Sequence, residues 1–105
     1  MRKSPPSPGE KRRFTMVWTH TFVRTARKFL SRHPDLEGVF ESALRQLESD
    51  PFAPRLRLHP LKGSHSGKHA VSLTCEYRIV LILHVTGSEI ILLDIGTHDA
   101  VYRGG

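Results

Sequence analysis

The sequence has almost no cysteine, since Cys75 is the only one in 105 residues. A single thiol cannot form an internal disulfide, so we expect a fold without covalent cross-links in a reducing compartment. Cys75 stands among residues typical of strands, which predicts a buried or half-buried thiol. Nothing in the sequence around it indicates a nucleophile.

Long apolar segments are absent too. No stretch approaches the ~20 apolar residues that cross a bilayer, and no apolar run of secretory length follows the charged N-terminus. We therefore expect a soluble, cytoplasmic protein without a membrane partner. With 105 residues, the chain can bury one modest core and form one domain.

The sequence also lacks the patterns of a metal or cofactor site. His59, His65 and His69 cluster in one stretch, but their spacing matches no familiar zinc pattern and the intervening lysines repel a cation. Ser64 and Ser66 have no orienting carboxylate that would make a hydrolase. No glycine-rich loop has nucleotide-binding spacing. We predict no metal and no small-molecule cofactor.

Positive charge is in excess. Lysine and arginine number 16 against 10 acidic residues, which gives a formal charge of +6 and a pI near 10.1. Such a field favours a polyanionic partner, with nucleic acid first and an acidic protein second. A solvated surface that binds nothing acidic remains the alternative.

The chain divides into a short tail and one domain. Residues 1–15 are rich in proline and basic residues, which predicts a disordered basic tail or an upstream extension, and Met16 is an alternative start. Residues 16–105 form the single domain. It begins with a short strand at Val17 and Trp18, and Thr19 is a good N-cap for the helix that follows.

Two helices precede the strands. Apolar residues recur at steps of three and four before and after His33-Pro34-Asp35, which breaks the pattern and predicts a helical hairpin. From Arg55 the period changes to two, so Leu56 and Leu58 point one way. The side chains predicted to point the other way are Arg55, Arg57 and His59.

The second half of the domain is predicted to be strands joined by turns. Strands are expected at 69–74, 77–85 and 90–93, with a turn at Glu76, a hairpin at 86–88 and an end of the last strand at Gly96. The predicted fold is α+β. A short N-terminal strand and a two-helix hairpin pack on a curved, mostly antiparallel sheet.

Arg78 is the most informative internal residue. A guanidinium in an otherwise apolar strand has to form an ion pair or meet an anion at the open face of the sheet. The candidate carboxylates are those of Glu76, Glu89 and Asp94. The alternative is a cationic open face shared with the outward residues of the preceding strand. Its rim would then carry Lys62, His65, Lys68 and His98.

Such a face suits RNA cleavage, which needs a base for the ribose 2′-hydroxyl, a cation at the phosphate and an acid for the 5′-oxygen. None of these roles requires a metal. His98 follows the last strand and Tyr102 lies four residues on, so both can share a site. We predict Arg78, His98 and Tyr102 as catalytic. The predicted RNA-binding residues are Arg55, Arg57, His59, Lys62, His65 and Lys68.

Several motifs together resemble the RelE/ParE superfamily of bacterial toxins, and in particular the RelE/StbE-type addiction-module toxins that stabilise plasmids. The resemblance covers nearly all of residues 16–103. The motifs are Trp18-Thr19, Ala26-Arg27-Lys28-Phe29, His33-Pro34-Asp35, Asp50-Pro51, Leu58-His59-Pro60-Leu61-Lys62-Gly63, Glu76-Tyr77-Arg78-Ile79-Val80 and Ile95-Gly96-Thr97-His98-Asp99-Ala100-Val101-Tyr102.

The resemblance implies a microbial-ribonuclease-like α+β fold and a type II toxin. Such a toxin cuts messenger RNA, usually on the ribosome, and so inhibits translation until a cognate antitoxin wraps it. Arg78 matches the strand arginine near the phosphate, and His98 and Tyr102 match the C-terminal catalytic region. The basic region that helps to hold RNA is matched by His59, Lys62 and Lys68.

Three other functions remain open. One branch of the superfamily poisons DNA gyrase by binding and has no nuclease residues, which His98 and Tyr102 argue against. A non-catalytic toxin-like protein that still pairs with an antitoxin is the second. A plain basic nucleic-acid-binding module is the third.

Overall fold

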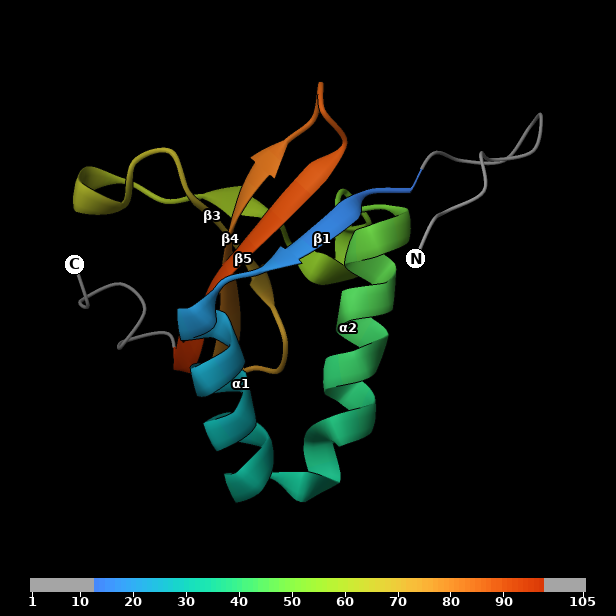
Figure 1. The fold of residues 1–105 in the computed structure, drawn as a ribbon, viewed down its shortest axis with the longest axis vertical. Coiled ribbons are helices and arrows are strands. Elements are labelled where there is room, and N and C mark those ends of the chain that lie inside the picture. The colour runs from blue at the N-terminus through green and yellow to red at the C-terminus, as the bar shows by residue number, and fades with distance from the viewer. Residues whose placement is uncertain (1–12, 98–105) are drawn as a thin grey trace.

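The computed structural model describes residues 13–97, which form two helices and a five-stranded mixed sheet (Figure 1). His98 and Tyr102 lie outside the described residues. The strand order is β1-β5-β4-β3-β2, with β1 parallel to β5 and the other pairs antiparallel. The elements are β1 (Thr15–Trp18), α1 (His20–Arg32), α2 (Glu37–Ser49), β2 (His59–Pro60), β3 (His69–Ser72), β4 (Tyr77–His84), β5 (Glu89–Thr97) and the 3₁₀ turns η1 (Pro34–Leu36), η2 (Pro54–Leu56) and η3 (Gly63–His65).

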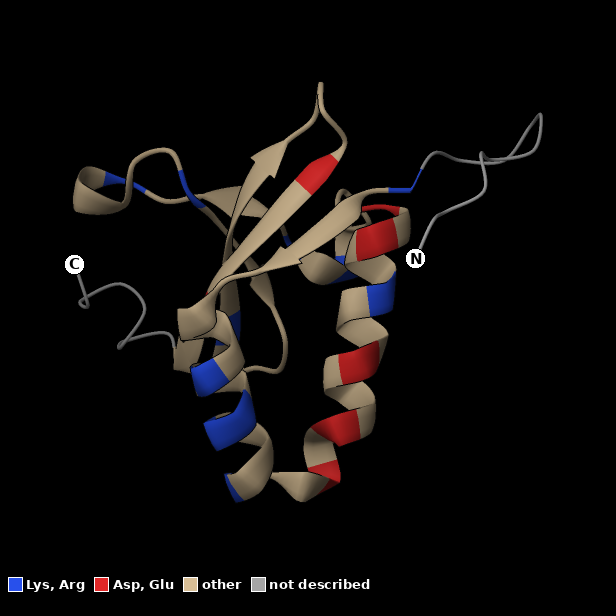
Figure 2. Cartoon of the chain, in the orientation of Figure 1, with Lys and Arg blue, Asp and Glu red and all other residues tan. Residues whose placement is uncertain are grey.

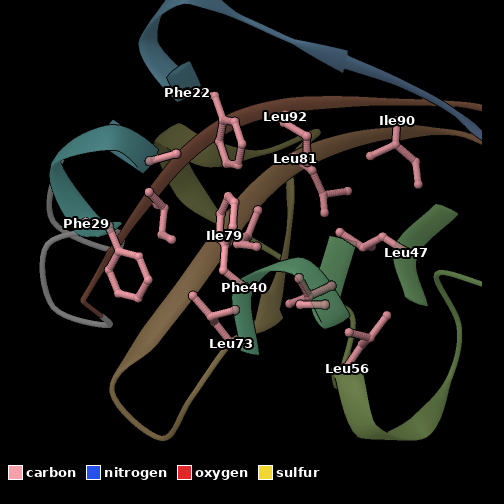
Figure 3. Packing of buried hydrophobic residues seen from close by; sticks show 14 residues of the cluster. Phe22, Phe29, Phe40, Leu47, Leu56, Leu73, Ile79, Leu81, Ile90 and Leu92 are labelled. Carbon is pink, nitrogen blue, oxygen red and sulfur yellow. The ribbon is translucent and has the colours of Figure 1, made fainter. Parts of the chain in front are cut away.

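The predicted α+β class and the helical hairpin are confirmed. The hairpin covers one face of the sheet, and its apolar stripes meet the strands in one cluster (Figure 3). Within this part of the chain no helix is long and apolar enough to cross a bilayer. The largest fully buried apolar side chains are Phe22, Leu47, Leu56, Val71, Ile79, Leu81, Ile90 and Leu92.

Thr19 joins the start of α1 to the centre of the sheet. Its hydroxyl oxygen accepts a hydrogen bond from the Phe22 N–H at 3.2 Å, as the predicted N-cap requires, and its hydroxyl donates to the Leu92 carbonyl at 2.7 Å. The helix therefore begins where β1 ends, directly beside β5. This fixes Phe22 over the core.

Residues 55–57 do not form the strand that their alternating apolar and basic residues predict. Pro54 instead begins the 3₁₀ turn η2, and Arg57 takes a left-handed conformation with φ of 53°. Proline has no amide hydrogen for a strand ladder, and a left-handed residue reverses the chain direction. Only His59 and Pro60 pair as β2, so the predicted outward row of Arg55, Arg57 and His59 does not form.

Two smaller predictions were also wrong. Cys75 is exposed rather than buried, because β3 ends at Ser72 and residues 73–76 form the turn into β4. The last strand does not end at Gly96 but continues to Thr97. Gly96 lies opposite Arg78 of β4, so the ladder extends through the glycine.

Replacing Thr19 with alanine removes both hydrogen bonds of its hydroxyl. We expect Thr19→Ala to lower the free energy of unfolding by about 1–2 kcal/mol, because one helix-cap bond and one bond to β5 are lost. Urea denaturation of the full chain measures this loss. Thr19→Ser keeps the hydroxyl and should recover most of the stability. An equal loss in both variants would contradict the role of the hydroxyl.

Residues 13–15 are also expected to stabilise the fold. The Phe14 N–H donates to the Glu48 carbonyl at 2.8 Å, the Thr15 N–H donates to the Ser88 carbonyl at 2.8 Å, and the Phe14 ring packs against the core. A chain that begins at Met16 should therefore be about 2–3 kcal/mol less stable than one that begins at Arg13. Thermal unfolding of the two chains makes the comparison, and equal midpoints would contradict it.

Candidate active site

The candidate site is built around Arg78 on the face of the sheet that the helices leave open. Side chains alternate along β4, so Ile79 and Leu81 enter the core while Arg78 and Val80 lie on the open face. In the ladder Arg78 stands between Ser72 of β3 and Gly96 of β5. Both neighbours are small, which leaves room above the sheet for the guanidinium.

Backbone carbonyls hold the Arg78 guanidinium. Its Nη1 donates to the carbonyl oxygens of Thr74 at 3.2 Å and Tyr77 at 3.4 Å, and its Nε is buried without a hydrogen-bond partner. A buried donor without a partner costs free energy unless a ligand satisfies it. The arrangement therefore orients the guanidinium and leaves its Nε–H without a partner.

The ion pair that the sequence offered for Arg78 does not form within residues 13–97. Glu89, the first residue of β5, pairs with His84 at the far end of β4, and its carboxylate is 3.5 Å from the His84 ring. Asp94 accepts the Ile95 N–H at 2.8 Å, and Glu76 is exposed in the preceding turn. Arg78 thus carries a positive charge that these carboxylates do not neutralise.

The end of β5 brings the chain toward this arginine. Thr97 pairs with Tyr77, one position along from the pair that Arg78 forms with Gly96. His98 comes next in the sequence, and it and Tyr102 lie outside the described residues. β4 begins and β5 ends at this edge of the sheet, so Arg78 lies close to the point where the described part of the chain ends.

A histidine–tyrosine pair lies at the start of β4, where the end of α1 meets the sheet. His33, the C-cap residue that follows α1, has its Nε2 3.0 Å from the Tyr77 hydroxyl. The Tyr77 ring also meets Phe29 edge-on, with ring centroids 4.9 Å apart. The sequence did not reveal this pair, because its members are 44 residues apart and no local spacing connects them.

His59 shares the open face with Arg78. It pairs with Ala70, which pairs with Val80, and directly paired residues place their side chains on one side of a sheet. From strand spacings, His59 lies about 12 Å from Arg78. Its Nδ1 is 2.8 Å from the Arg57 carbonyl.

The other predicted RNA-binding residues fall into two groups. Lys62, His65 and Lys68 belong to the loop between β2 and β3, which backbone hydrogen bonds from His65 to Lys62 and from Lys68 to His65 close into a compact unit. This loop joins β3 at His69, three residues from Ser72 beside Arg78. Arg55 lies instead against α2, where its Nη2 donates to the Ser42 hydroxyl at 2.8 Å.

The open face is therefore not the uniform cationic surface that the sequence predicted. A small apolar cluster of Leu61, Ala70, Val80 and Leu93 occupies its middle. Both ring nitrogens of His65 are buried and have no hydrogen-bond partner. Among residues 13–97, no three histidine, cysteine or acidic side chains form a group that could hold a metal ion. Cationic groups flank an apolar centre.

Comparison with family models gives no match, and neither does comparison with curated proteins. Solved structures do match over most of the chain. YafQ from E. coli has a TM-score of 0.71 at 16% identity, and the match covers 85% of this chain and 98% of YafQ.

Two further structures are similar to this chain. A YoeB/ParE toxin from Agrobacterium tumefaciens has a TM-score of 0.66 at 23% identity, covering 81% of this chain and 99% of its own. The toxin–antitoxin complex RelBE2 from Mycobacterium tuberculosis gives 0.64 at 22% identity, with coverage of 82% and 99%. The protein therefore has the fold of the RelE/ParE superfamily of toxins, as the resemblance of its sequence motifs predicted.

Proposed function

We propose that this protein is the toxin of a type II toxin–antitoxin pair and that it cleaves messenger RNA on the ribosome without a metal. One observation carries the proposal. Arg78 is fixed at the end of a central strand, keeps an unused buried donor, and has no carboxylate partner among the described residues. The likeness of the fold to solved toxin structures also supports the proposal.

In the proposed reaction the ribose 2′-oxygen attacks the adjacent phosphorus while the bond from phosphorus to the 5′-oxygen breaks. A base removes the proton of the 2′-hydroxyl, and an acid protonates the departing 5′-oxygen. The products are a 2′,3′-cyclic phosphate and a 5′-hydroxyl. Arg78 stabilises the charge that gathers on the phosphate, because a preorganised cation needs no reorganisation during the reaction.

His98 is assigned the proton transfer, since imidazole gains and loses a proton near neutral pH. Tyr102 stacks on a base or donates a proton. His59 and the loop that carries Lys62, His65 and Lys68 bind the RNA backbone beside the reacting phosphate. Arg57 is an exposed cation next to His59 and is assigned to the same backbone contacts.

A cognate antitoxin is the proposed protein partner. Two similar structures are toxin–antitoxin complexes, RelBE2 and DinJ-YafQ, the second with a TM-score of 0.70 at 16% identity. The excess of positive charge on this chain favours an acidic inhibitor and rapid association at low salt.

The first test is induction of the full chain in a bacterial host, with transcript ends mapped for wild type, Arg78→Ala and His98→Ala. We expect growth arrest and discrete messenger cuts for wild type. Arg78→Ala should reduce cleavage about 10²–10³-fold, because a positioned cation is lost at the transition state. The matched controls are Arg27→Ala and His20→Ala, which remove an exposed side chain of the same kind from α1.

Three outcomes of this experiment would contradict the proposal. Arrest with intact messenger would overturn cleavage and favour the gyrase-poisoning branch. No arrest from a folded, soluble product would leave a non-catalytic binding protein. Equal losses in Arg78→Ala and Arg27→Ala would show a general charge effect rather than a site.

Tyr77, which precedes Arg78 in β4, is proposed as a positioning residue for the candidate active site. Tyr77→Phe removes the hydroxyl that contacts His33, so we expect a loss of about 1 kcal/mol of stability and a lower kcat with little change in KM. His33→Leu should behave similarly. In a double-mutant cycle the two changes should be less than additive, and strict additivity of the stability losses would contradict the contact.

A further inference from the structure

Asp94 is a carboxylate on the same face of the sheet as Arg78. It pairs with Val80, which belongs to the apolar cluster of the open face, and a register shift in the β4–β5 ladder places Leu93 in that cluster as well. Arg78 pairs with Gly96, two residues further along β5. Asp94 and Arg78 are therefore diagonal neighbours in the ladder, at a separation of about 7–8 Å.

Hydrogen bonds hold these two side chains apart. The Arg78 Nη1 donates to the carbonyl oxygens of Thr74 and Tyr77, which lie toward the start of β4 and away from Asp94. The Asp94 Oδ1 accepts the Ile95 N–H at 2.8 Å, and this bond orients the carboxylate. An ionised carboxylate has about four acceptor positions, so Asp94 keeps acceptors on both of its oxygens for a ligand.

A carboxylate on a face that binds RNA suits a base better than the backbone. It accepts hydrogen bonds and cannot donate them, and its charge repels phosphate groups. The bases of single-stranded RNA present N–H donors on their Watson–Crick edges, where proteins read them by hydrogen bonding. Asp94 therefore fits the edge of an unpaired base that lies beside the phosphate at Arg78.

Guanine is the base whose edge matches a carboxylate. Its ring N1–H and its exocyclic amino group are donors that stand side by side, so each can meet one carboxylate oxygen in a charge-assisted hydrogen bond. Adenine and cytosine present an amino donor next to a ring nitrogen that only accepts. Uracil presents one N–H between two carbonyl oxygens. In these three bases a lone pair would face the negative charge, which is unfavourable.

We propose that Asp94 reads a guanine beside the phosphate that Arg78 stabilises, and so gives the proposed ribonuclease a base preference. The ring of the guanine lies against Leu93, which is half-buried and offers apolar surface, while its Watson–Crick edge meets the Asp94 carboxylate. The separation of Asp94 from Arg78 is within the length of one nucleotide, so the base and the phosphate belong to the same or to adjoining nucleotides. The assignment rests on the proposed binding of RNA at the open face.

The test compares four hexanucleotides that lack the 2′-hydroxyl and so cannot be cut. Every base is uracil except the third, which is guanine, adenine, cytosine or uracil. In NMR titrations of the isotope-labelled full chain, the guanine hexamer should shift the amides of Asp94, Ile95 and Gly96 and bind at least about tenfold more tightly than the other three. Asp94→Asn should bring the four dissociation constants within about twofold, because its amide still accepts the Ile95 N–H but presents a donor to the guanine.

Glu89→Gln is the matched control, since it removes a carboxylate at the far end of the same strand. It should leave the preference for guanine within about twofold of wild type. Equal binding of the four hexamers by wild type would overturn the proposal. An equal loss of preference in Glu89→Gln and Asp94→Asn would also overturn it, because it would reveal a general charge effect. The amide spectrum of each variant verifies that it is folded.

Mapped messenger ends separate this base preference from the cleavage itself. Guanine should be enriched at one fixed position beside the cuts of wild type, and Asp94→Asn should lose that enrichment. Cuts without a base preference, together with equal binding of the hexamers, would leave the cleavage standing and overturn the role of Asp94. Enrichment that persists in Asp94→Asn would overturn that role too. Selective binding of the guanine hexamer without any cuts would support the role of Asp94 and overturn the cleavage.

Discussion

The pairing of β4 with β5 supports the rest of this structure. The two strands pair along the whole length of β4, and their buried side chains Ile79, Leu81, Ile90 and Leu92 form the floor on which the helices rest. β1 pairs with β5 on one side of this pair, and β3, which also pairs with β2, pairs with β4 on the other side. Thr19 attaches α1 to the Leu92 carbonyl in the same pair. Weakening the β4–β5 pairing would therefore destabilise both the packing of the helices and the candidate site.

An irregularity in the same pair decides which side chains face the open surface. The register shifts between Val80 and Leu81, so that Val80 lies opposite Asp94 while Leu81 lies opposite Leu92. Leu93 is the extra residue of this bulge and joins the open-face cluster. Strict alternation from Leu92 would turn Asp94 toward the core, whereas the bulge turns Ile95 inward instead. It also aligns Gly96 with Arg78.

Charge is distributed unevenly over this framework. Basic residues mark α1 and acidic residues predominate on α2 (Figure 2). Arg78 lies on the open face without a carboxylate partner among residues 13–97. RNA is assigned to the open face, where a single oriented guanidinium meets a phosphate.

The sequence by itself determined the elements whose signals are local. Helical spacing on both sides of His33-Pro34-Asp35 determined the hairpin, Thr19 marked the start of α1, and the motifs around Arg78 carried the resemblance that predicted the fold. Alternation failed at Arg55 and Arg57, because Pro54 and a left-handed residue interrupt a pattern that looks like a strand.

Only the tertiary structure decided what depends on distant partners. It separated Arg55 from Arg78, brought His33 to Tyr77, and left Arg78 without an ion pair to the three carboxylates that the sequence offered. It also brought Arg13, Arg45 and Arg55 around one hollow. The physical reason is that spacing along a chain specifies which face of its own element a residue occupies. Which side chain it meets is set by strand register and by the packing of the helices on the sheet.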